Sequence, residues 1–235
     1  MKRLMVLTVV AGWGIAVCAA DGVPQNEINQ AIQGLAAQPN YSWTATTKPE
    51  SNTPVTRQGP TEGKTEQNGY TYFRFTLEGK AVEVARKGSK SAIKTETAWE
   101  ASEQLTGDRQ WIARRLYAFK APAAEAEDLL KIIKALRSEK GGVYAGDLTA
   151  QGVKDLLLSR SRNDMVARIP AGAKGSVRFW VKAGLLVKYE YNLQAKIVLS
   201  DHQQEFTVNR TTTVEVKDVG STKVELPEEA KKKLS

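Results

Sequence analysis

Alternating apolar and polar residues occupy two parts of the chain and predict antiparallel β-sheet. In residues 70–77, Phe73, Phe75 and Leu77 share one face, and glycine turns near residues 79 and 88 lead into two further short alternating segments. Period-two alternation between glycine turns is typical of consecutive hairpins, since parallel neighbours would need long crossover connections. We therefore predict an antiparallel meander over residues 70–97.

The last third of the chain repeats this pattern more strongly. A hairpin is predicted from residues 176–182 and 185–194, with a turn at Ala183-Gly184, and a final short strand at residues 223–227. The apolar face of these strands carries Leu185, Val187, Tyr189, Tyr191, Leu193, Phe206, Val208, Val214 and Val216. Strands that are apolar on one side only indicate a sheet with one buried and one solvated face.

Helical spacing separates the two β regions and also precedes the first. Ile28, Ile32 and Leu35 predict a short helix that ends near Pro39. Further helices are expected at residues 99–105, 109–119 and 122–140, the last with a stripe of Leu129, Ile132, Ile133 and Leu136, and around Val153, Leu156 and Leu157. A short strand is expected near Val143, and residues 48–63, rich in Pro, Thr and Gly, indicate a loop or a ragged edge strand.

Residues 1–20 have the three parts of an export signal. Lys2 and Arg3 are followed by an uncharged apolar stretch over residues 4–17 and by small residues before Asp21. The apolar stretch is shorter than the roughly 20 residues that span a bilayer. We therefore predict cleavage after Ala19 or Ala20, leaving residues 21–235 as a single exported, periplasmic domain.

Cys18 is the one cysteine of the chain and offers an alternative to a soluble product. A bacterial lipoprotein is anchored through a cysteine that follows a small residue, and here Val17 precedes it, which makes a poor lipidation site. We favour a cysteine lost with the signal peptide over a membrane anchor through Cys18. The mature chain then has no disulfide, so its stability depends on an ordinary core.

Charge and residue inventory exclude several functional classes. The net charge of +8 falls by two, to +6, once Lys2 and Arg3 are removed, and no basic stripe with interleaved aromatics is present, so nucleic acid is not an expected partner. The chain has one histidine, His202, in a polar run between strands, and no nucleophile elbow, phosphate-binding glycine loop or metal-ligand spacing. The acidic residues Glu125, Glu127 and Asp128 fall in the first turns of a predicted helix, where they offset its dipole. We expect no enzyme, no catalytic residue, no metal and no cofactor.

Two motifs in the last third resemble a known family. Residues 175–182 (GSVRFWVK) and 184–190 (GLLVKYE) resemble a hairpin of the LolA/LppX/LprG-like periplasmic lipid-carrier superfamily, and residues 213–227 resemble its closing strand. Val219 and Thr222 depart from that closing pattern, which has an aromatic residue and a proline there. The order of elements, from N-terminal helix through meander and central helices to a second meander, is also similar.

The resemblance implies an α+β, mainly β fold: an antiparallel half-open β-barrel with helices covering the concave face around an apolar cavity. It implies a monomeric, non-catalytic binder or carrier of a lipid, lipoprotein or other apolar ligand, with an envelope membrane protein as a further partner. A periplasmic sensory or regulatory binding module and a structural envelope protein with a filled core remain as alternatives. The residues expected to line the cavity are Phe73, Phe75, Leu185, Val187, Tyr189, Tyr191, Leu193, Phe206, Val208 and Val214.

Overall fold

The computed structural model describes residues 22–50, 57–77, 79–94, 98–160, 166–169, 172–199 and 205–235. The predicted signal peptide with Cys18, and His202, lie outside these residues. The strands are β1 Asn40–Pro49, β2 Arg57–Glu66, β3 Tyr70–Leu77, β4 Lys80–Lys87, β5 Lys90–Lys94, β6 Trp99–Ala101, β7 Ile133–Glu139, β8 Val143–Leu148, β9 Val166–Arg168, β10 Lys174–Lys182, β11 Leu185–Leu199 and β12 Glu205–Lys217. The α-helices are α1 Gly22–Ala36, α2 Gln110–Tyr117, α3 Pro122–Lys131, α4 Ala150–Arg160 and α5 Glu228–Lys233, with 3₁₀ turns at Ser102–Gln104 and Gly107–Arg109.

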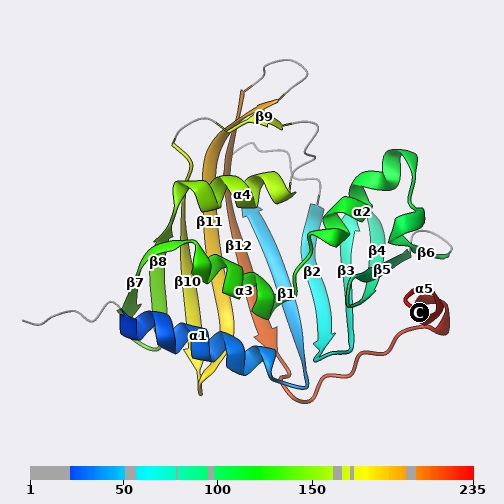
Figure 1. Cartoon of the computed structure of the whole chain (residues 1–235), viewed down its shortest axis with the longest axis horizontal. Helices are drawn as coiled ribbons and strands as arrows, with labels where there is room; N and C mark the ends of the chain where they lie inside the picture. Colours follow the sequence, from blue (N-terminus) through cyan, green and yellow to red (C-terminus); the bar gives the residue numbers. More distant parts are fainter. Residues whose placement is uncertain are drawn as a thin grey trace, which may run out of the picture.

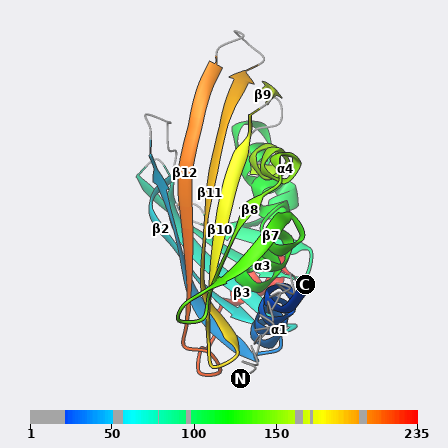
Figure 2. The same ribbon diagram turned by 90° about the vertical axis from the view of Figure 1, so that its left-hand side faces the viewer.

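All twelve strands belong to one antiparallel sheet. Its order is β6-β5-β4-β3-β2-β1-β12-β11-β10-β8-β7, with β9 paired to the far end of β11. The sheet is bent, and α1, α3 and α4 lie on its concave face (Figures 1 and 2). The predicted fold class, a mainly β half-open antiparallel barrel with helices over the concave face, is confirmed.

The predicted hairpins are present, because their turn residues adopt the backbone conformation that a tight turn requires. Ala183 and Gly184 have φ values of 50° and 75°, the left-handed pair that a two-residue turn between twisted strands requires. The strands β3 to β5 follow one another as neighbours, and so do β10, β11 and β12. The first predicted helix is also confirmed as α1, and the helix around Val153 as α4.

The predicted helix over residues 122–140 is wrong in its second half. Helix α3 ends at Lys131, and β7 begins at Ile133 and pairs with β8 as the edge of the sheet. Gly146 of β8 faces this strand so closely that a Cβ there would lie 2.5 Å from the Ala135 carbonyl oxygen. Strand pairing thus satisfies the backbone of a segment whose apolar spacing also fits a helix.

Three other predictions are corrected. Trp99 opens the short strand β6, which pairs with β5, and only residues 110–117 of the two predicted middle helices are α-helical. The region expected to be a loop or an edge strand contains β2, an interior strand between β1 and β3. No strand forms at residues 223–227, where the chain runs to α5.

Two apolar clusters stabilise opposite faces of the sheet. The concave-face cluster includes Val84 and Ile93 and continues through the helices, whereas their chain neighbours Ala85 and Ala92 belong to the second cluster. Successive strand residues point to opposite faces, so the second cluster lies on the convex side. It is closed by residues of the C-terminal segment, Leu226, Ala230 and Leu234. The concave face is thereby left to the helices α1 to α4.

Candidate functional site

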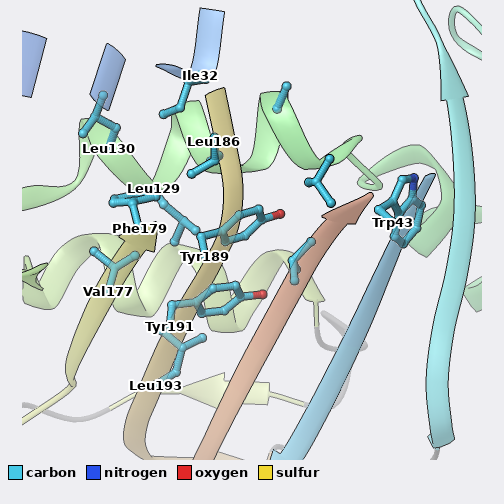
Figure 3. Packing of buried hydrophobic residues seen from close by; sticks show 14 of the residues in the cluster. Ile32, Trp43, Leu129, Leu130, Val177, Phe179, Leu186, Tyr189, Tyr191 and Leu193 are labelled. Carbon is cyan, nitrogen blue, oxygen red and sulfur yellow. The ribbon is translucent and has the colours of Figure 1, made fainter. Parts of the chain in front are cut away.

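The concave face collects seven of the ten residues predicted to line a cavity. They are buried in the concave-face cluster and come from three strands: Phe73 and Phe75 from β3, Tyr189, Tyr191 and Leu193 from β11, and Val208 and Val214 from β12. Figure 3 shows the β11 residues projecting toward the helices beside Phe179 of β10 and Leu129 of α3. The sequence therefore identifies the buried face of these strands.

Leu185, Val187 and Phe206 do not join this cluster, and each is partly exposed. The register of β10 and β11 shifts between Trp180 and Val181, so β11 contains one extra residue at Val187. Such a bulge reverses the alternation on its N-terminal side, and Leu186 takes the buried position in place of its neighbours. Phe206 lies near the start of β12, opposite Ile197.

An aromatic cluster that the sequence analysis missed fills the β1 to β3 side of the face. Phe119, from the connection between α2 and α3, stacks on Phe73 with ring centroids 4.3 Å apart and lies 5.9 Å from Trp43. The Trp43 indole nitrogen donates a hydrogen bond of 3.1 Å to the Thr65 hydroxyl. Trp43 and Phe119 lie 76 positions apart in the chain, so only the fold brings them together.

Polar contacts attach the helices to this apolar face. The Tyr189 and Tyr191 hydroxyls both donate to the Glu125 carboxylate of α3, at 2.5 and 3.3 Å. The Tyr144 hydroxyl donates to Glu27 of α1 at 2.7 Å. Burial raises the pKa of Tyr41, whose hydroxyl is bonded to the Ala123 backbone at the start of α3. Helices α1 and α3 are therefore fixed to the sheet by hydrogen bonds in addition to apolar packing.

Glu125→Ala is expected to lower the free energy of unfolding by about 1–3 kcal/mol, because it removes the acceptor that two buried tyrosine hydroxyls share. Glu127→Ala, on the same helix, removes an exposed carboxylate paired with Lys131 and is expected to cost under about 1 kcal/mol. Urea unfolding of both variants measures the difference. Equal losses would show that the tyrosine contacts contribute nothing beyond helix propensity.

The middle of the concave face is packed in the part of the chain that the structure describes. The side chains of Phe179, Tyr189 and Leu193 have no exposed surface, so sheet and helices are in direct contact along the middle of the face. A ligand that occupies this part of the face must therefore take the place of helix contacts.

The described residues contain no group of three or more His, Cys, Asp or Glu side chains placed to hold a metal ion. Within the same residues no helix is both long and apolar enough to cross a bilayer.

Comparisons with known proteins match this chain by structure. No family model matches, and no curated protein matches by sequence. The lipoprotein LppX of Mycobacterium tuberculosis aligns with a TM-score of 0.49 and 12% identity over 87% of this chain and 99% of its own. LprF of Mycobacterium bovis aligns at 0.47 and 12% over 88% and 97%, and a LolA superfamily protein of Nitrosomonas europaea at 0.34 and 11% over 87% and 95%.

These likenesses concern the fold alone.

Proposed function

We propose that the mature chain is an exported, non-catalytic binder or carrier of a lipid or another apolar ligand, which it holds between the concave face and the helices. The observation that carries this proposal is the continuous apolar face of a half-open sheet, covered by short helices in the part of the chain that the structure describes. The export signal over residues 1–20 supports an envelope location, where such ligands are found.

Ligand entry requires the helices to separate from the sheet, and an acyl chain supplies enough free energy for that. At about 0.8 kcal/mol per buried methylene, a sixteen-carbon chain gains on the order of 12 kcal/mol. The polar contacts that hold the helices, such as Tyr144 to Glu27 and Tyr189 to Glu125, contribute about 1–3 kcal/mol each. The apolar contacts between helix and sheet are replaced by similar contacts with the ligand.

A structural envelope protein with a filled core is the second candidate, favoured by the complete burial of Phe179, Tyr189 and Leu193. The sensory alternative uses the same ligand-binding face, so an experiment on the ligand bears on both binding functions.

The proposal is tested by native mass spectrometry of the full-length gene product, exported in its own host and purified without detergent. We expect a protein mass that begins at Ala20 or Asp21 without an acyl group, together with a bound species of lipid mass. Added palmitate at about one hundred times its dissociation constant should stabilise the delipidated protein by about 2.7 kcal/mol. Folded protein with no bound mass and an unchanged melting temperature would replace the proposal by the structural candidate.

A further inference from the structure

A pocket of about 420 Å³ opens between the ends of β3 and β4 and one side of α3. Its wall contains Arg86, Phe119 and the charged residues Lys120, Glu127, Asp128 and Lys131. Phe119 also stacks on Phe73 of the concave-face cluster. The pocket therefore borders the apolar face at one end of the sheet.

Arg86 lies on the concave side, at the alternating positions of Val82 and Val84. Its Nη1 donates 2.6 Å to the Phe119 carbonyl oxygen, and its guanidinium carbon lies 5.4 Å from the centre of the Phe119 ring. Its Nε is buried and has no hydrogen-bond partner. Burial also lowers the pKa of Arg86 below its ordinary value. The guanidinium is thus held in place on one side and left unpaired at Nε.

The acidic side chains of the pocket already have cationic partners. Asp128 forms an ion pair with Lys120, and Lys131 pairs with Glu127 at 2.9 Å and with Asp128 at 3.4 Å. Among the residues that the structure describes, no carboxylate forms an ion pair with Arg86. A partly buried guanidinium without a counter-charge is costly, and the cost is lowered when an anion supplies the opposite charge.

We propose that this pocket binds the anionic headgroup of an amphiphile, a phosphate or carboxylate, with Arg86 as its counter-charge. A guanidinium matches such a group in charge and in the planar arrangement of its donors. The start of α3 borders the pocket with Ala121, which provides no side-chain cap, and the positive end of a helix favours an anion. An acyl chain attached to the anion would follow Phe119 onto the concave face, so the proposal rests on the proposed function and specifies its ligand.

The test uses isothermal titration of the delipidated mature protein with three probes: decyl phosphate, neutral decyl maltoside and inorganic phosphate. Decyl phosphate should bind the wild type, and Arg86→Gln should weaken it about tenfold or more, the loss expected for charge-assisted hydrogen bonds. Arg86→Lys keeps the charge but loses the planar guanidinium. Its affinity for decyl phosphate should lie between those of the wild type and Arg86→Gln. Lys87→Gln removes the same charge one residue away, from an exposed side chain over Tyr70, and should bind like the wild type.

The three probes distinguish a free anion from an anionic amphiphile, and they distinguish failure of the anion site from failure of the proposed function. Equal affinity of decyl phosphate for the wild type and both Arg86 variants would overturn the anion site, and binding of decyl maltoside in that case would leave the proposed function standing. Inorganic phosphate that binds as tightly as decyl phosphate, with the same loss in Arg86→Gln, would keep the anion site but overturn its assignment to an amphiphile. Failure of decyl maltoside while decyl phosphate still binds in an Arg86-dependent way would support the anion site, because the neutral probe lacks the headgroup that the site recognises.

Discussion

Leu193→Ala is expected to lower the free energy of unfolding of ligand-free protein by about 2–5 kcal/mol, the cost of a leucine removed from a packed core. The side chain has no exposed surface, and it lies on β11 opposite Gly175, which has no side chain of its own to fill the space. This loss is a large share of the roughly 5–15 kcal/mol that stabilises a domain.

Leu185→Ala provides the matched control, because it is the same substitution on the same strand at a partly exposed position. It should cost less than about 1.5 kcal/mol, below the range of packed core sites. Denaturant unfolding with unchanged m-values gives both numbers. A Leu193→Ala cost as small as that of Leu185→Ala would mean that the face around Leu193 is open in solution, with a cavity in place of the packing seen here.

Local sequence pattern was sufficient to predict the hairpins, but not to predict which face of the sheet each strand residue points to. Alternation and glycine turns predict β3 to β5 and β10 to β12 because pairing between consecutive strands depends on nearby residues. The bulge at Val187 could not be predicted, since Leu185, Leu186 and Val187 are all apolar and fit either phase. Leu186 takes the buried position because it packs against other elements in the concave-face cluster.

Contacts between distant parts of the chain also determined structure that local residue spacing alone did not predict. Ile133 and Leu136 fit both a helical stripe and a strand, and pairing with β8 determined the outcome. The sequence analysis predicted no helix at the C-terminus, yet Ala230 and Leu234, spaced by four residues, bury one side of α5 against the convex face. A short helix with two apolar residues gives too weak a signal to be recognised from sequence.

The polar residues of the site were accessible to sequence analysis only in part. Arg86 continues the alternation of Val82 and Val84, and a charge on an otherwise apolar face is a visible signal. Glu125 was assigned to the helix dipole, and its contacts with Tyr189 and Tyr191 depend on the packing of α3 across β11. Residues that far apart in sequence cannot be paired without the fold.

Gly63→Ala is the second substitution expected to have a large effect, about 3 kcal/mol of destabilisation, at the upper end for overpacked cores. Gly63 of β2 lies between Trp43 and Phe73 on the neighbouring strands, and a Cβ there would lie 2.2 Å from the Trp43 ring. The ring cannot easily move, because its nitrogen is bonded to Thr65 and its other neighbours include Phe119. Gly63 is not among the residues with positive φ, so backbone strain does not contribute.

A double-mutant cycle with Trp43→Leu assigns this cost to the ring. Once the indole is gone, Gly63→Ala should be close to neutral, or stabilising by about 0.5–1 kcal/mol, because alanine restricts the unfolded chain more than glycine does. Lys64→Ala, at the adjacent exposed position of the same strand, should change stability by less than about 0.5 kcal/mol. Additive losses in the double variant would contradict the contact between Gly63 and Trp43. They would also contradict the closed packing of the aromatic cluster, which includes Phe119 and borders the proposed path of the ligand.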